Sequence, residues 1–159
     1  MRTLLLLSIL LFTAISCNRP NCDIEPNLSV DQDQLKADIA KIDAYLAENN
    51  IDAEKHPSGI RYVIIEEGDG DKPSVCGNVV VDYKGSLISD GSEFDKSSRP
   101  IGFSLRSLIV GWQVGIPLIK ERGNIHLYIP SVYAYGATER PKIPANSNLF
   151  FEIKLYVTD

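Results

Sequence analysis

The stretch Asn78-Val79-Val80-Val81-Asp82-Tyr83-Lys84-Gly85-Ser86-Leu87 decides the fold class of this chain. It is rich in valine and predicts one long β-strand over residues 78–87. Ser89-Asp90-Gly91 follows and is typical of a hairpin-like turn, after which Glu93-Phe94-Asp95 continues the chain. This pattern indicates an antiparallel sheet.

Strand-like segments continue on both sides of this hairpin. Residues 60–65 precede it, and residues 124–129 and 149–157 follow it with alternating faces. A short helix is expected over 107–114, where Leu108, Ile109 and Trp112 are apolar. Several strands and one short helix predict an α+β domain, a curved antiparallel sheet (half-barrel) wrapped around one short helix.

An amphipathic helix is expected before this domain, over residues 29–50. Ser29 and Gln32 fit a capping box, and Asn49-Asn50 ends the pattern. Apolar residues recur with helical spacing at Leu35, Ile39, Ile42 and Leu46. This stripe must be buried, and two partners are open: the domain that follows, or a second copy of the chain in a homodimer.

The first residues are typical of an export signal. Met1-Arg2 precedes an apolar run from Leu4 to Phe12, which is shorter than the roughly 20 residues that span a bilayer. Residues 1–16 therefore predict a lipoprotein signal peptide, with Cys17 lipidated and the protein anchored to the bacterial cell envelope, on its periplasmic or outer-membrane face. The alternative is an ordinary signal peptide with Cys17 unmodified. Residues 17–28 are expected to form a flexible tether.

Two further cysteines, Cys22 and Cys76, leave two interpretations open. They could form a disulfide after export, because the compartment is oxidising. They could equally be two independent thiols, because nothing in their spacing requires a bond.

Composition and missing motifs exclude several functions. The net charge of −5 argues against nucleic-acid binding, which normally needs a basic face. No nucleophile lies in a signature with either histidine, and no metal-ligand constellation or phosphate-binding glycine loop is present. The unusual feature is Tyr133-Ala134-Tyr135-Gly136-Ala137, an aromatic pair in a loop between prolines, which is typical of a pocket lining.

The chain resembles the FKBP family of peptidyl-prolyl cis/trans isomerases across residues 58–159, with the domain expected over 57–159. The segments that carry the resemblance occur in the family's order: 79–85, 90–95, 108–112, 133–137, 143–144 and 149–153. Two departures accompany it. The loop between Asp95 and Phe103 is shorter than in familiar members, and the segment 138–142 is more charged.

The resemblance implies a site made of aromatic and polar residues. The catalytic positions that it implies are Phe94, Asp95, Ile109, Trp112 and Tyr135. The substrate-binding positions that it implies are Tyr83, Phe103, Leu108, Ile143 and Phe151. Trp112 would be the floor beneath a proline ring, and the Tyr135 hydroxyl and Ile109 N–H would donate to substrate carbonyls.

The function that the resemblance implies is isomerisation of Xaa-Pro bonds in exported proteins, with no cofactor and no metal. The expected partners are proline-containing polypeptides, the membrane through a lipid anchor, and macrolide inhibitors such as tacrolimus and rapamycin. The alternatives are a chaperone or peptide-binding scaffold with little turnover, and a structural lipoprotein that acts through its helix.

Overall fold

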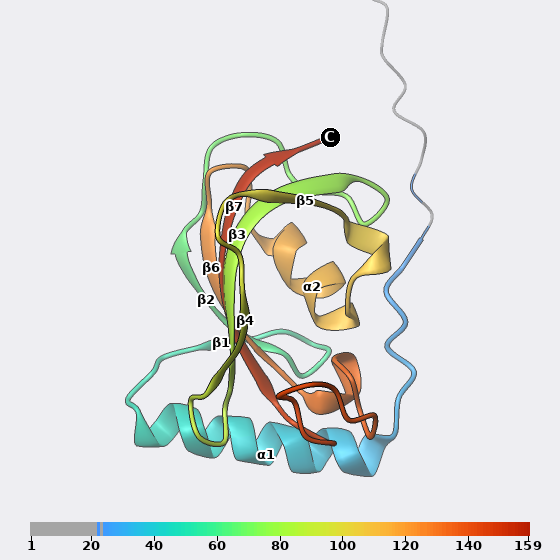
Figure 1. The fold of residues 1–159 in the computed structure, drawn as a ribbon, viewed down its shortest axis with the longest axis vertical. Helices are drawn as coiled ribbons and strands as arrows, with labels where there is room; N and C mark the ends of the chain where they lie inside the picture. The colour runs from blue at the N-terminus through green and yellow to red at the C-terminus, as the bar shows by residue number, and fades with distance from the viewer. Residues whose placement is uncertain (1–21, 23) are drawn as a thin grey trace, which may run out of the picture.

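The computed structural model describes Cys22 and residues 24–159. One antiparallel sheet curves around a short helix, and a longer helix crosses one end of the sheet (Figure 1). This arrangement confirms the expected α+β half-barrel. The helices and strands follow in chain order: α1 (Gln32–Glu48), β1 (Glu54–Lys55), β2 (Arg61–Glu66), β3 (Asn78–Leu87), β4 (Glu93–Lys96), β5 (Ile101–Ser104), η1 (Leu105–Ser107), α2 (Val110–Gly115), η2 (Ile116–Leu118), β6 (Asn124–Ile129), η3 (Ser131–Tyr133) and β7 (Leu149–Thr158).

The long strand β3 organises the sheet. The strand order is β1-β2-β6-β7-β3-β4, and β5 also pairs with β3. Because β3 pairs with β4 and β5 on one side and β7 on the other, it joins the two arms of the half-barrel. Val79 and Val81 are fully buried in the main core, and because side chains alternate between the two faces of a strand, both point to the same side. The bounds predicted for β3 and β6 are confirmed.

The helix on the concave face begins later than the sequence predicted. A 3₁₀ turn, η1, precedes it, and Leu108 and Ile109 then have extended backbones before α2 begins at Val110. The predicted helix over 107–114 is therefore wrong at its start. Leu108 and Ile109 belong to the connection between η1 and α2. Their apolar side chains line a cavity and are not part of a helical stripe.

The N-cap of helix α1 lies two residues later than the sequence predicted, at Asp31 instead of Ser29. The carboxylate of Asp31 accepts hydrogen bonds from the N–H groups of Asp33 and Gln34, both at 2.9 Å. The capping box predicted at Ser29 and Gln32 is therefore wrong, because the nearby Asp31 supplies an equally suitable acceptor. The predicted end is confirmed, with Asn49 as the C-cap.

The apolar stripe of α1 packs against the chain's own domain. Ile42 is fully buried, and Leu35 and Leu46 are nearly so. Ile42 and Leu46 form a small second core with Ile88 and Tyr128, while Leu35 joins the main core. This packing confirms the first of the two expected partners, and the stripe is not free to form a dimer seam.

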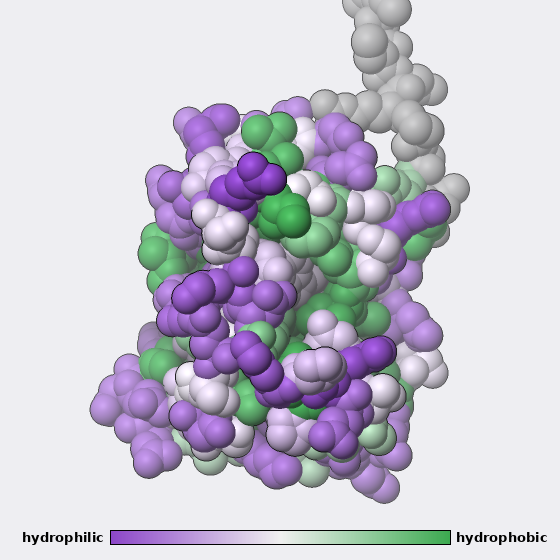
Figure 2. All heavy atoms as spheres, in the orientation of Figure 1, coloured by the Kyte–Doolittle hydropathy of each residue, from purple (hydrophilic) through white to green (hydrophobic). Residues whose placement is uncertain are grey.

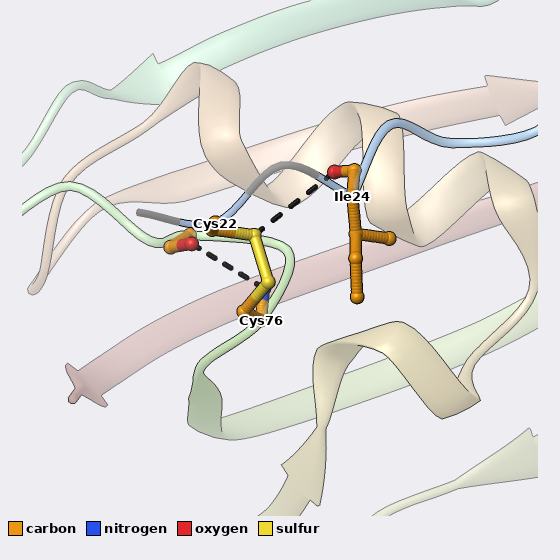
Figure 3. Close-up of a disulfide and its surroundings, with 4 residues drawn as sticks. Cys22, Ile24 and Cys76 are labelled. Carbon is orange, nitrogen blue, oxygen red and sulfur yellow. Dashed lines mark hydrogen bonds between the residues drawn. A yellow bond between two sulfur atoms is a disulfide. The ribbon is translucent and has the colours of Figure 1, made fainter. Parts of the chain in front are cut away.

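A disulfide joins the segment before α1 to the loop before β3. Cys22 and Cys76 are bonded across a sequence separation of 54 residues (Figure 3). The structure thus decides between the two interpretations of these cysteines. It also limits the expected tether over 17–28, because Cys22 is attached to the domain. The predicted signal peptide and the lipidation site at Cys17 lie outside the described residues.

No helix in the described part of the chain is both long and apolar enough to cross a membrane.

Candidate active site

A cavity of about 300 Å³ opens between the concave face of the sheet and α2. Apolar surface gathers in a hollow near the middle of the face shown in Figure 2. The residues that line the cavity come from β3, β4, β5, η1, the connection between η1 and α2, α2 itself, the loop after η3, and β7. They are Tyr83, Phe94, Asp95, Phe103, Ser107, Leu108, Ile109, Trp112, Tyr135 and Phe151.

Trp112 lies at the centre of the aromatic lining. Its ring centroid is 5.2 Å from those of Tyr83 and Phe151, with interplanar angles of 78° and 86°. Phe103 also meets it edge to face, and Phe94 meets Phe151 in the same way. Such T-shaped contacts are the favourable geometry for aromatic rings. They hold Trp112, which is 4% exposed, in one orientation in the cavity lining.

Gly85 makes room for two of these rings. A β-carbon at this position would lie 2.5 Å from Cζ of Phe94 and 2.8 Å from Cε1 of Phe151. Both distances are shorter than carbon atoms tolerate without displacement. The glycine in β3 is therefore required by the close approach of the cavity wall.

Asp95 and Tyr83 form a polar edge on the cavity. The Tyr83 hydroxyl donates to Oδ2 of Asp95 at 2.7 Å. Burial raises the pKa of Tyr83 to about 12, and the hydrogen bond to Asp95 is the second-largest cause of this rise. Tyr83 therefore stays protonated at physiological pH, and the Asp95 carboxylate remains fixed at the rim.

Three hydrogen-bond donors at the cavity have no acceptor among the described residues. The indole Nε1 of Trp112 is buried and unpartnered. The N–H of Ile109 forms no hydrogen bond with that part of the chain, because its extended backbone precedes the helix. The Tyr135 hydroxyl likewise forms none with the residues described. Buried polar groups are normally paired, so the Trp112 indole N–H is unusual, and the partly exposed N–H of Ile109 and hydroxyl of Tyr135 are available to a ligand that carries acceptors.

Comparison with protein families decides the class. The family model for FKBP-type peptidyl-prolyl cis-trans isomerases matches residues 70–156, more than half of the chain. The chain belongs to this family.

Bacterial members of the family are similar along much of the chain. FkpA from Escherichia coli K12 is 45% identical over 101 residues, which are 62% of this chain and 37% of that protein. A probable FkpA from Neisseria meningitidis is 40% identical over 128 residues, 76% of this chain and 46% of that protein. The chain thus spans less than half the length of these relatives.

Solved structures of FKBP-type proteins share the fold. The crystal structure of FkpA from Escherichia coli has a TM-score of 0.69 at 36% identity, covering 80% of this chain and 64% of that one. A peptidyl-prolyl cis-trans isomerase from Pseudomonas syringae has a TM-score of 0.70 at 32% identity, covering 80% and 95%.

The cavity of this FKBP domain brings together all but one of the predicted site residues. Ile143 does not line the cavity; it is 5% exposed and packs in the main core. Ser107 lines the cavity but was not predicted, and its hydroxyl donates to the carbonyl oxygen of Ser104 at 2.7 Å. A small polar residue beside Leu108 gives no sequence signal of its own.

The charged segment 138–142 of the FKBP domain reaches the rim of the cavity. The guanidinium of Arg140 lies over the Tyr135 ring, 5.5 Å from its centroid. This cation–π contact places a positive charge beside a residue that lines the cavity. Among the described residues, no group of three or more His, Cys, Asp or Glu side chains could hold a metal ion.

Proposed function

We propose that this protein is a peptidyl-prolyl cis/trans isomerase that binds proline-containing segments of exported polypeptides in the cavity around Trp112. Family membership supports the reaction class. The observation that carries the proposal for this chain is an aromatic cavity together with donors at Ile109 and Tyr135 that have no acceptor among the residues described.

The residue types suit the physical problem of the reaction. Rotation about a peptide bond faces a barrier of about 18–20 kcal/mol, because resonance gives the C–N bond double-bond character. Twisting the Xaa-Pro bond breaks this resonance and makes the carbonyl less polar. Water favours the polar planar ground state, so an apolar cavity that excludes water removes part of the barrier.

Fixed donors hold the peptide in the bent shape that rotation requires. In the proposed complex the proline ring lies on Trp112, and the Ile109 N–H and Tyr135 hydroxyl donate to carbonyl oxygens beside the ring. Asp95, held by Tyr83, orients the polar edge and contributes a negative field at the rim. These groups act by position and electrostatics, and no proton is transferred.

Substitution of one tyrosine hydroxyl tests the proposal. Tyr135→Phe should lower kcat/KM for an Xaa-Pro test peptide by about ten-fold, since a lost hydrogen bond to the twisted state costs about 1–1.5 kcal/mol. Tyr156→Phe is the matched control, because it removes a hydroxyl that donates to Asp82 away from the cavity. Equal activity of the two variants would contradict the proposed role of Tyr135.

The alternative function is a chaperone or scaffold that binds proline-containing segments with little turnover. Quenching of Trp112 fluorescence by the peptide reports binding, because Trp112 is the single tryptophan of the chain. Binding without acceleration by the folded wild type would favour this alternative. Competition by tacrolimus or rapamycin for both binding and catalysis supports one shared site.

We also propose that the protein is exported and anchored to the bacterial cell envelope by lipid on Cys17. The leader pattern supports export, and the Cys22–Cys76 disulfide is typical of an oxidising compartment. Cys17→Ala should move the protein from the membrane fraction to the soluble fraction of the cell. Mass spectrometry of wild type should find acyl chains on the N-terminal cysteine, and an unmodified Cys17 would contradict the anchor.

A further inference from the structure

A carboxylate on α1 is buried outside the cavity, among groups that the proposed mechanism does not use. Asp38 is fully buried, between Leu35 and Ile42 on the face that α1 turns toward the domain. Burying a carboxylate is costly unless every oxygen is hydrogen-bonded, so the position demands an explanation.

Both carboxylate oxygens of Asp38 and its backbone carbonyl oxygen accept hydrogen bonds. Its Oδ2 accepts from the Ser131 hydroxyl at 2.6 Å, and its Oδ1 accepts from Nε2 of Gln34 at 2.8 Å. Its backbone carbonyl accepts from Nδ2 of Asn148 at 3.2 Å. The Asn148 side-chain oxygen in turn accepts from the Ser131 N–H at 3.0 Å, so three residues close a ring of hydrogen bonds.

Ser131 connects this ring to the loop that carries Tyr135. Its carbonyl oxygen accepts from the N–H of Ala134 at 2.9 Å and from the N–H of Gly136 at 2.8 Å. These two amides flank Tyr135 on either side. The position of Ser131 therefore sets the position of the backbone from which the Tyr135 side chain projects.

The ring of hydrogen bonds among Asp38, Ser131 and Asn148 fixes the position of η3 relative to α1. A hydrophobic contact between α1 and this loop would bury the same surface without the cost of removing a charge from water. A fully hydrogen-bonded buried network, by contrast, allows one arrangement of its members. In Figure 1, η3 lies against α1, which is where the ring ties the two elements together.

We propose that α1 positions the loop that carries Tyr135. Asp38 is the positioning residue: it holds Ser131 and thereby fixes where the Tyr135 hydroxyl lies in the cavity. The inference rests on the proposed isomerase function and extends it to α1, a helix that lies outside the half-barrel and α2. Asp38 touches no substrate; it acts through Ser131.

The experiment compares two anchors of the same helix. Asp38→Ala removes the anchor to the loop, and Asp43→Ala removes the anchor to β2, where Asp43 accepts two hydrogen bonds from Arg61. At a temperature where both variants are folded, Asp38→Ala should lower kcat/KM by about ten-fold through kcat, since small displacements of catalytic groups are costly. Asp43→Ala should change kcat/KM less than about two-fold.

Amide hydrogen exchange gives a second readout that does not need activity. Asp38→Ala should speed exchange of the Ala134 and Gly136 amides relative to Asp43→Ala, because the acceptor Ser131 is no longer held. Asp38→Asn should restore both readouts in large part, since its oxygen still accepts from Ser131 and the Gln34 amide can turn to accept from its NH₂. Ser131→Ala removes the other end of the bond and replaces Asp38→Ala if that variant does not fold.

Equal kinetics and equal exchange in Asp38→Ala and Asp43→Ala would overturn the inference. A wild type that is inactive toward Xaa-Pro peptides would overturn the proposed function instead. In that case, exchange at Ala134 and Gly136 still decides whether Asp38 positions the loop.

Discussion

At the scale of single residues, the cavity depends on which way each side chain turns. The identity of Trp112, Phe94 and Tyr135 could be predicted from the sequence, because their motifs resemble those of a known family. The orientation of Ile143 could not, since a loop pattern does not say whether an apolar side chain faces a cavity or the core. Asp38 was missed because a lone Asp on a helix is typical of a solvated face, and its partner Ser131 lies 93 residues away.

Gly85 provides a prediction at this scale. Gly85→Ala should lower kcat/KM and reduce the free energy of unfolding by about 1–3 kcal/mol, because the new methyl group displaces the Phe94 and Phe151 rings. Kinetics and urea unfolding of the same preparation measure the two effects. Gly102→Ala in β5 is the control, since a β-carbon there meets nothing within 4 Å. An active, fully stable Gly85→Ala variant would show that the rings are not held closely.

At the scale of elements, predictability followed the regularity of the pattern. Strand β3 could be bounded from the sequence because it is rich in valine and a turn follows it, and β6 because its residues alternate between two faces. The start of α2 could not, because Leu108 and Ile109 are apolar in an extended segment that faces the cavity. The cap of α1 was misplaced because Ser29 and Asp31 both suit an N-cap, and only the packing of the chain selects between them.

The attachment of α1 to β2 should depend on pH. The Arg61 guanidinium, which hydrogen-bonds Asp43 at 2.8 and 3.0 Å, holds the pKa of that carboxyl below its ordinary value of 3.8. The pair therefore stabilises the fold fully above the unfolded pKa. The unfolded chain protonates Asp43 at a higher pH than the folded chain does. The stabilisation that the ion pair gives is therefore lost as the pH falls through the lowered pKa of Asp43.

We therefore expect Asp43→Asn to reduce the free energy of unfolding by about 1–3 kcal/mol at neutral pH, because the buried Arg61 guanidinium is left without the opposite charge of Asp43. The deficit should shrink as the pH is lowered below about 4. Urea unfolding followed by Trp112 fluorescence measures it. Asp33→Asn, on the exposed face of the same helix, should have an effect below about 0.5 kcal/mol. A deficit that stays constant with pH would mean that the ion pair does not stabilise the fold.

At the scale of the whole molecule, the disulfide and α1 together tie the N-terminal part of the chain to the half-barrel. The bond between Cys22 and Cys76 closes a loop that contains all of α1. The sequence left this bond open because the distance between two cysteines depends on the complete fold. In physical terms, only the docking of α1 brings the two segments together.

Breaking the disulfide should reduce stability and leave catalysis intact. Reduction should lower the free energy of unfolding by about 2–4 kcal/mol, since the cross-link restricts the unfolded chain over a long loop. Activity should persist because neither cysteine lines the cavity. The double variant Cys22→Ser/Cys76→Ser should be insensitive to reductant. If reduction left the free energy of unfolding and the unfolding midpoint of the wild type unchanged, the bond would have no stabilising role.

The measurement that tests the central claim most directly is magnetisation-exchange NMR on an Xaa-Pro peptide at equilibrium. It reports the rate of interconversion between the cis and trans isomers without a coupling protease. The account predicts that the folded wild type accelerates exchange in proportion to its concentration, and that tacrolimus and Tyr135→Phe both reduce this acceleration. An exchange rate equal to that of the free peptide, with the peptide bound in the cavity, would contradict it.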